Sequence, residues 1–569
     1  MGDWHNTTAS IESLQVDDLP FRSRRSPVLS RHASVATSQP LATSIGIDLL
    51  RQGANAADVA VAVAATLAVV EPCSTGLGGD MFCLFYKASE KKVYAINGSG
   101  CAPMSLTLDR VLQDCPKGVD DFKFSPHAVT VPGAARGWED TVKKFGSGKF
   151  SLAQILEPAA QLAEEGFPVS PVTSHHWASG KVQLDQWNSD YSPLTNSEGN
   201  TPKPGEVFQN PDMAAVLRSL GAHGATDGFY GSKPGQAIVE AIQQHGGLMT
   251  MEDLNNHSTL FPEAISAQYR NVLLWQVPPN GQGIAALIGL TGLASLEEEG
   301  VIPKLSPETV AKTAESYHVQ LEMIRLGFGD ARTYVSCPGS CDENKTQWLL
   351  DKERISNRAK KLFDPTKATS QEPALPSSDT VSFQVVDSEG NAISFVNSNF
   401  NGFGTGICPA GCGFSLQNRG FNFSLDKTDR NVLSGGKRPS HTIIPGMLTY
   451  ADSGDLYATL SNMGGFMQPQ GHLQLTVNLV AGGMDPQEAI DTPRFCIPQG
   501  TQDGQVQFET GIPQDVLEQL QAMGHNMVPN VAGHARSTFG RAQIIKKDPV
   551  TGVLWAGSDG RGDGCAMGF

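Results

Sequence analysis

The sequence lacks an apolar run long enough to cross a bilayer and a recognisable secretory signal. Its most apolar run lies between Val59 and Val70, well short of the ~20 residues that a membrane-spanning helix needs. The segment from Met1 to Asn6 has neither the basic nor the apolar part of a signal peptide. Asn6 also stands where the N-myristoylation pattern requires Ser or Thr. From these features we expect a cytoplasmic protein that does not associate with membranes.

Positive charge is also scarce, and the cysteines do not indicate a disulfide framework. The chain has 42 Lys and Arg against 58 Asp and Glu, a net charge of −16, which argues against nucleic acid and anionic membranes as partners. Ten cysteines are scattered along the 569 residues, so we expect reduced thiols. The pairs Cys337/Cys341 and Cys408/Cys412 could suggest zinc, but no histidine or acidic pattern accompanies them. We therefore expect neither a metal nor a cofactor.

Glycine, by contrast, is abundant, with 60 residues. A glycine-rich stretch at 74–80 follows a helix predicted over Ala56–Val70, which Asn55 caps, and precedes a strand predicted over Met81–Tyr86. A dinucleotide-binding loop requires the reverse order, with the strand before the glycines and the helix after them. We therefore interpret these glycines as positions where the backbone passes close to another segment or to a ligand.

The rest of the chain mixes helices and strands. Residues 1–35 are polar and rich in Ser and Arg, which indicates a mobile leader, and a strand is predicted to enter at Ala33–Val35. Other predicted elements include strands at 94–97, 128–131 and 413–416, a hairpin of 443–450 with 456–460, and a helix over 472–481.

A second hairpin begins at Asp379. Residues 379–387 alternate apolar and polar side chains, which is typical of a strand with one buried face. Residues 387–391 form a turn, and 392–396 return as a second strand. The polar, proline-containing run at 370–378 indicates an exposed linker. Thr380 therefore lies where a linker meets a strand.

This position of Thr380 has a chemical interpretation. If the peptide bond before it were cut, Thr380 would carry both a hydroxyl and a free α-amine, whose reference pKa is about 7.7–8.0. A terminal Thr paired with its own amine is a known form of activated nucleophile. The alternative is that Thr380 simply begins a strand, because β-branched residues favour strands.

A pair of glycines, Gly464 and Gly465, leads from a predicted strand towards a helix. Glycines in such a place can present bare backbone N–H groups, which are the material of an oxyanion hole. The alternative is an ordinary glycine turn.

Several segments together resemble the γ-glutamyltransferase (glutathione hydrolase) family of N-terminal nucleophile hydrolases. The resemblance runs from about residue 30 to the end. It is carried by 52–60, 71–79, 131–133, 158–160 with 165–167, 278–279, 403–406, 463–465, 492–495 and 557–561.

This resemblance implies an α+β fold, a four-layer αββα sandwich. It also implies a precursor that cleaves itself before Thr380 into a large chain, 36–379, and a small catalytic chain, 380–569, which stay associated. Thr380 matches the family's nucleophile, Ser398 matches a hydroxyl that bonds the nucleophile's amine, and Gly464 and Gly465 match the oxyanion hole. The implied reaction passes through an acyl-enzyme on a small-molecule amide and needs no cofactor.

The substrate-binding positions depart from the family pattern. Ser99 occupies the place of an Arg that holds the glutamate α-carboxylate, and His441 and Thr442 replace a Ser-Ser pair. Asn422 replaces the acid that holds the α-amine, and Asn399 beside the catalytic Ser completes the expected binding set. A hydroxyl is a poor substitute for a bidentate Arg. His441 is interpreted equally well as a packed structural residue.

Three functions follow from this pattern. The first is hydrolysis or transfer of the acyl group of γ-glutamyl amides such as glutathione. The second is an N-terminal nucleophile amidase for a non-glutamyl acyl group, and the run Gln417-Asn418-Arg419-Gly420 resembles the cephalosporin-acylase-like branch. The third is an unprocessed, inactive homologue, against which the presence of Thr380, Ser398 and the glycine pair argues.

Overall fold

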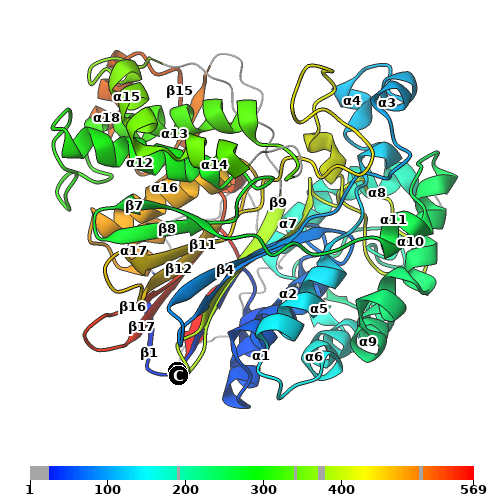
Figure 1. Cartoon of the computed structure of the whole chain (residues 1–569). Coiled ribbons are helices and arrows are strands. Elements are labelled where there is room, and N and C mark those ends of the chain that lie inside the picture. The colour runs from blue at the N-terminus through cyan, green and yellow to red at the C-terminus, as the bar shows by residue number, and fades with distance from the viewer. Residues whose placement is uncertain (1–24, 189–191, 339–342, 370–378, 499–503) are drawn as a thin grey trace, which may run out of the picture.

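Two antiparallel β-sheets lie face to face at the centre of the protein, and helices cover the outer face of each sheet (Figure 1). The computed structural model describes residues 25–188, 192–338, 343–369, 379–498 and 504–569. The expected four-layer αββα sandwich is thereby confirmed. None of the helices in these ranges combines the length and the apolar character needed to span a membrane.

Both sheets combine strands from distant parts of the chain. The six-stranded sheet has the order β18 (Cys565–Gly568), β2 (Ser34–Thr37), β9 (Asp379–Val386), β10 (Ala392–Phe400), β3 (Asp80–Lys87) and β4 (Lys92–Gly98). The seven-stranded sheet has the order β1 (Val28–Ser30), β17 (Leu554–Ser558), β16 (Ala542–Lys547), β12 (Leu456–Asn462), β11 (Gly446–Tyr450), β8 (Val272–Gln276) and β7 (Ile265–Tyr269). Strands β9 and β10, which carry the predicted nucleophile, lie in the middle of the first sheet.

The helices form the two outer layers. Those over the six-stranded sheet include α1 (Pro40–Arg51), α2 (Ala56–Val70), α5 (Ala134–Phe145), α6 (Leu152–Glu165) and α9 (Pro211–Ala225). Those over the seven-stranded sheet include α12 (Ile284–Glu298), α13 (Ala314–Tyr334), α15 (Lys352–Leu362), α16 (Met467–Val480), α17 (Pro486–Asp491) and α18 (Gln514–Ala522). Further helices within the described ranges are α3 (Leu108–Asp114), α4 (Val119–Phe122), α7 (Pro171–Ser179), α8 (Lys181–Trp187), α10 (Lys233–Gln244), α11 (Met251–Asn255) and α14 (Glu343–Leu349).

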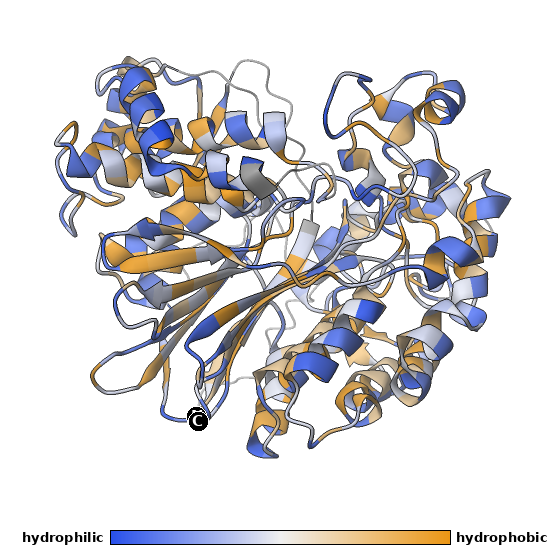
Figure 2. Cartoon of the chain, in the orientation of Figure 1, coloured by the Kyte–Doolittle hydropathy of each residue, from blue (hydrophilic) through white to orange (hydrophobic). Residues whose placement is uncertain are grey.

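Three apolar cores correspond to the three interfaces between the layers. Figure 2 shows apolar residues concentrated in the strands and in the helix faces next to them. Every residue of α2 is buried, and Asn55 caps this helix through a capping box with Asp58, as predicted. Burial of a whole helix explains why α2 is apolar all round rather than amphipathic.

The prediction of one solvated face on β9 is wrong. Val381, Phe383 and Val385 pack towards the helical layer, as the alternation indicated. The polar face is not solvated, because the other sheet covers it and Gln384 donates to the Ser461 hydroxyl of β12 at 2.5 Å. The alternation in this strand therefore turns its apolar side chains towards the helical layer and polar side chains such as Gln384 towards the other sheet, with both faces buried.

Other predicted elements had mixed outcomes. The hairpins are confirmed as β9–β10 and β11–β12, and α16 begins at Met467, before the predicted start. The strands predicted at 128–131 and 413–416 are wrong. The backbone of 416–417 bonds to loop residues, with Leu416 N donating to Ile407 O, so no strand ladder forms there. The linker at 370–378 lies outside the described residues.

The segment predicted as a mobile leader contains structure. β1 pairs with β17, and the Arg25 guanidinium donates to the Gly564 carbonyl at 2.8 Å. Residues 25–32 are therefore part of the sandwich rather than of a mobile leader, whereas the strand predicted at 33–35 is confirmed by β2. Residues 1–24 of the leader lie outside the described residues.

Candidate active site

The side chains of Thr380 and Ser398 meet at the start of β9. The Thr380 hydroxyl donates to Ser398 Oγ at 3.0 Å, and both side chains are fully buried. β9 and β10 form one hairpin, and its register brings these two residues together although 18 positions separate them in sequence. The structure thus joins two of the four predicted catalytic residues directly.

A β-bulge shapes this meeting point. Asp379 pairs with Phe400 and Val381 pairs with Asn397, so Ser398 and Asn399 together oppose Thr380. Phe400 has a φ of 79°, in the left-handed region that is uncommon for an aromatic residue. Its backbone N–H donates to Ser398 Oγ at 2.9 Å. The Ser398 hydroxyl is therefore held from both sides, by Phe400 and by Thr380.

The glycine-rich stretch at 74–80 packs against this bulge. A Cβ added at Gly79 would lie 2.3 Å from the Ser398 carbonyl oxygen, and one at Gly78 would lie 2.1 Å from the Ser415 carbonyl oxygen. Asn399 N also donates to Ser74 O at 3.2 Å. The prediction that these glycines permit a close backbone approach is confirmed, and the neighbouring segment is the one that carries Ser398 and Asn399.

Gly464 and Gly465 lie between β12 and α16, with φ values of 124° and 58°. Only glycine adopts a φ of 124° without strain, because it lacks a Cβ. Met467 N donates to Gly464 O and Gln468 N donates to Gly465 O, so the pair opens directly into the first turn of α16. β12 itself faces β9 through the Gln384–Ser461 hydrogen bond. The glycine pair therefore follows the strand that packs against the nucleophile strand.

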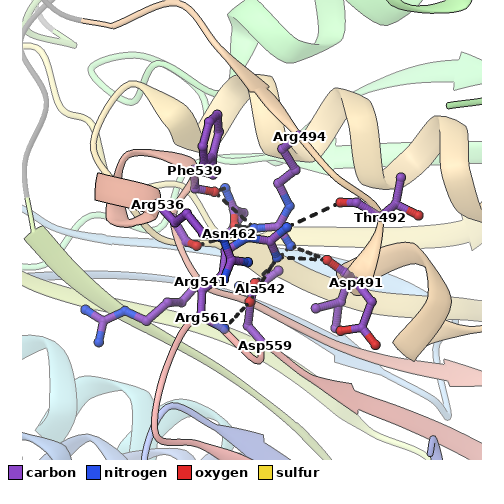
Figure 3. Close-up of polar contacts among 12 residues, drawn as sticks. Asn462, Asp491, Thr492, Arg494, Arg536, Phe539, Arg541, Ala542, Asp559 and Arg561 are labelled. Carbon is purple, nitrogen blue, oxygen red and sulfur yellow. Dashed lines mark hydrogen bonds and ion pairs between the residues drawn. The ribbon is translucent and has the colours of Figure 1, made fainter. Parts of the chain in front are cut away.

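A buried ionic network lies at Asn462, close to the glycine pair in sequence (Figure 3). The Arg494 guanidinium donates to Asn462 Oδ1 at 3.0 Å and to Asp559 Oδ2 at 2.9 Å. Arg561 donates to Asp559 at 3.0 Å and to the Glu509 carboxylate at 2.5 Å. Asn462 is the last residue of β12, two positions before Gly464. The sequence analysis assigned no role to these residues, although Arg494, Asp559 and Arg561 lie in segments that carry the family resemblance.

His441 does not offer a ring nitrogen to a ligand. Its Nδ1 accepts from Ile443 N at 3.4 Å, so the Nε2–H donates to the Asp80 carboxylate at 3.0 Å. Burial, reinforced by the positive charge of Arg419, lowers the pKa of His441 to about 3 and leaves the ring neutral. These contacts favour the interpretation of His441 as a packed structural residue.

The Asp80 carboxylate accepts hydrogen bonds from several distant segments in this region. One of its oxygens accepts from Gly100 N, Gly133 N and Gln417 Nε2, while the other accepts from His441. Burial would raise the pKa of Asp80, but the hydrogen bond from His441 and nearby positive charge hold it below the usual range. No sequence pattern points to Asp80, because its partners are far apart in the chain.

The other predicted binding residues differ in whether their polar atoms already have hydrogen-bond partners. The Ser99 hydroxyl donates to Asn97 Oδ1 at 2.7 Å and accepts from Asn280 at 3.2 Å, so the protein already uses it. Asn422 donates to the Ser440 carbonyl at 3.0 Å, while its own Oδ1 lacks a partner among the described residues. The Oδ1 of Asn399 likewise has none there. Asn422 and Asn399 can therefore each offer an acceptor oxygen.

Thr442 pairs with Arg419, which belongs to the run Gln417-Asn418-Arg419-Gly420. Its hydroxyl accepts from the Arg419 guanidinium at 2.7 Å. The Arg419 side chain is fully buried, and its guanidinium lies over the Phe400 ring at 4.4 Å from the centroid. A cation is thus present beside the bulge that carries Ser398.

One group of side chains elsewhere has metal-ligating character. The ligand atoms of His318, Glu322 and His525 lie within 4.8 Å of one another. However, His318 Nδ1 and His525 Nε2 share a hydrogen bond at 2.8 Å, and Arg325 pairs with Glu322 at 2.9 Å. A buried Arg on the carboxylate opposes the binding of a cation.

Comparison with known proteins extends these observations. The sequence model of the gamma-glutamyltranspeptidase family matches residues 42–569. The chain is 33% identical over 552 residues to the glutathione hydrolase-like YwrD proenzyme of Bacillus subtilis, covering 95% of this chain and 99% of that one. It is 28% identical over 550 residues to the oxamate amidohydrolase proenzyme of Klebsiella pneumoniae, covering 95% of this chain and 99% of that one.

A solved structure also places the chain among the relatives of this family. The crystal structure of cephalosporin acylase from Bacillus halodurans superposes with a TM-score of 0.84 at 36% identity, covering 97% of this chain and 98% of that one. The resemblance stated from sequence is therefore confirmed, including its cephalosporin-acylase-like side. This chain belongs to the gamma-glutamyltranspeptidase family and is an enzyme of the hydrolase/transferase type.

Proposed function

We propose that the chain cleaves itself before Thr380 and that the freed Thr380 then hydrolyses or transfers the acyl group of small amides through an acyl-enzyme. The observation that carries this proposal is the 3.0 Å hydrogen bond from Thr380 Oγ1 to Ser398 Oγ at the start of β9. A hydroxyl nucleophile needs a neighbouring group that can accept its proton.

The chemistry follows in two stages. In the uncut chain Thr380 Oγ1 attacks the carbonyl carbon of residue 379, the C–N bond breaks, and the resulting ester is hydrolysed by water. Thr380 then has a free α-amine, which takes the hydroxyl proton when Oγ1 attacks a substrate amide and gives it to the leaving amine. Water, or an acceptor amine, releases the acyl group and restores the hydroxyl. Gly464 and Gly465 supply backbone N–H groups for the oxyanion.

The two chains produced by this cut remain associated. In the six-stranded sheet, β2, β3 and β4 come from the large chain, and β18, β9 and β10 come from the small chain. β9 pairs with β2, and β10 pairs with β3. The seven-stranded sheet is mixed in the same way, because β1, β7 and β8 precede the cut. Separation would break both sheets and expose both apolar cores.

Two acyl classes are candidates. The names of several relatives, glutathione hydrolase among them, support a γ-glutamyl group. The residues of this chain favour the second class, an acyl group that carries a carboxylate and no α-amine. Neither Asn422 nor Ser99 bears a charge, so neither replaces the charged group that would select an α-amino acid. Oxamate, named for one relative, is an amide of this second class.

The first experiment tests self-cleavage. Purified protein on a denaturing gel is expected to give two bands, with Thr380 as the new N-terminal residue. Thr380→Ala is expected to remain one chain without amidase activity. Thr333→Ala, at an exposed position of α13, is the matched control and is expected to cleave normally. One uncut, inactive wild-type band would support the inactive homologue instead, and two bands from Thr380→Ala would disprove the nucleophile.

A second experiment separates the acyl classes. The γ-glutamyl and glutaryl p-nitroanilides share a carbon chain and a carboxylate but differ in the α-amine. We expect kcat/KM for the glutaryl compound to equal or exceed that for the γ-glutamyl compound. A preference of more than about tenfold for the γ-glutamyl compound, or ~1.4 kcal/mol, would show that the enzyme reads the amine.

A further inference from the structure

Arg419 is a buried cation, and three of its five N–H donors, those on Nε and Nη2, lack partners among the described residues. Its side chain is fully buried, and Nη1 donates to Thr442 Oγ1 at 2.7 Å. Nε and Nη2 have no hydrogen-bond partner among the described residues. These two nitrogens form one edge of the guanidinium, and parallel N–H groups on one edge match the two oxygens of a carboxylate. The unused capacity therefore has the geometry of an anion site.

Two other buried arginines, Arg494 and Arg561, have carboxylate partners. Arg494 pairs with Asp559 at 2.9 Å, and Arg561 pairs with Glu509 at 2.5 Å. Arg419 has no such ion pair within the described ranges, and Asp80, the anion that acts on it, is already bonded to His441, Gln417 and backbone N–H groups. Burial lowers the pKa of Arg419 to about 9. An unpaired buried charge is costly, which an anionic ligand would offset.

Hydrogen bonds connect the segment that carries this cation to the bulge opposite Thr380. Asn418 N donates to Asn399 O at 3.3 Å, and the side chains of Asn418 and Asn401 bond at 3.0 Å. The guanidinium lies over the ring of Phe400. Phe400 N donates to the Ser398 hydroxyl that accepts from Thr380. The segment with Arg419 is thus tied by hydrogen bonds to the bulge residues opposite Thr380.

We propose that Arg419 binds the carboxylate of the acyl group through Nε and Nη2 and so makes the enzyme specific for amides of dicarboxylic acids. Thr442 holds Nη1 and fixes the plane of the guanidinium. The proposal rests on the function proposed above, since it places the acyl carbonyl at Thr380 and the distal carboxylate at Arg419. It gives a cation to a site whose expected Arg position is occupied by Ser99, which is already bonded to Asn97 and Asn280.

The kinetic test compares two anilides that differ only in the carboxylate. Glutaryl p-nitroanilide carries it, and pentanoyl p-nitroanilide has a methyl group in its place. We expect the wild-type enzyme to prefer the glutaryl compound by at least about 100-fold in kcat/KM, a difference of ~2.7 kcal/mol. Arg419→Gln is expected to lose this preference because its KM for the glutaryl compound rises. Its turnover of the pentanoyl compound should change less than about threefold. Arg419→Lys, which keeps a charge without the two-pronged edge, should fall between them.

Two controls separate this proposal from the function on which it rests. Arg430→Gln removes an exposed Arg from the loop that follows and should leave both substrates unchanged. Arg419→Gln should still produce two bands on a denaturing gel, because self-cleavage needs no substrate carboxylate. A cleaved Arg419→Gln enzyme that keeps the wild-type preference, or that loses both substrates in equal proportion, would overturn the proposal.

A binding measurement extends the test to protein that does not turn over. Glutarate is expected to raise the Tm of the wild-type enzyme and of Thr380→Ala, since a ligand that binds only the folded state stabilises it. The neutral glutaramide should have no such effect, and Arg419→Gln and Arg419→Lys should respond less to glutarate. If glutarate and glutaramide shift the Tm of the wild type equally, Arg419 is not a carboxylate site, whatever the role of Thr380.

Discussion

Replacing Arg494 with Met tests whether the buried ionic network positions the glycine pair. Arg494 donates to Asn462 Oδ1, Phe539 O, Ile490 O and Asp559 Oδ2. Met fills a similar volume but donates no hydrogen bond. The substitution therefore leaves three buried acceptors with fewer donors, while Asp559 keeps its contacts with Arg561 and the Ala542 N–H. Asn462, two residues before Gly464, loses the cation that holds its side chain.

The magnitude follows from burial. Removing one partner of a buried ion pair costs about 3–5 kcal/mol. At roughly 2.1 cal/mol/K per residue, a chain of 569 residues has an unfolding entropy of about 1.2 kcal/mol/K. We therefore expect Tm to fall by about 3–4 °C in a calorimetric scan. Because a displacement of about 1 Å can cost ~100-fold in rate, kcat should fall by about 10–100-fold while KM changes little.

Arg218→Met is the matched control. Arg218 is a half-exposed Arg that pairs with Glu157 at 3.1 Å and with Glu164 at 2.7 Å. Exposed ion pairs contribute about 0–1 kcal/mol, so Tm should change by less than about 1 °C and kcat should not change. If Arg494→Met matches this control in both Tm and kcat, the ionic network does not position the glycine pair. A lower Tm with an unchanged kcat would give the network a purely structural role.

Two further predictions concern the Ser398 hydroxyl and acid stability. Ser398→Ala should slow both self-cleavage and turnover by about 100-fold, because Thr380 loses its 3.0 Å acceptor, whereas Ser398→Thr should keep most of the rate; equal rates for the Ala and Thr variants on a timed gel would contradict this role. Burial alone would raise the pKa of Asp559, but Arg561 and Arg494 hold it below the usual range. Its contribution to stability is therefore present above the unfolded-state pKa, about 3.9, and is lost as the pH falls. The fall in Tm between pH 6 and pH 3 should be smaller in Asp559→Asn than in the wild type, and an identical fall would refute the assignment.

The local elements around the nucleophile were predictable from short-range patterns. The period-two alternation after Asp379 identified β9, and the capping residue Asn55 with the apolar run after it identified α2. The family motifs identified the sandwich, because their order extends over most of the chain. The strand predicted at 413–416 was wrong because hydrogen bonds to loop residues replace a strand ladder there. The backbone of Leu416 bonds to the loop residues Ile407 and Thr405, which no local pattern indicates.

What the sequence by itself determined is the fold family, the place of Thr380 at a strand start, and the loss of charge at Ser99 and Asn422. Only the tertiary structure decided which polar groups inside the protein are already paired. Asp80 bonds to His441 across 361 positions, and Arg494 bonds to Asp559 across 65, whereas the edge of Arg419 that carries Nε and Nη2 finds no partner among the described residues. Pairing depends on distances between strands and loops that are remote in the chain, and those distances are set by the packing of the two sheets.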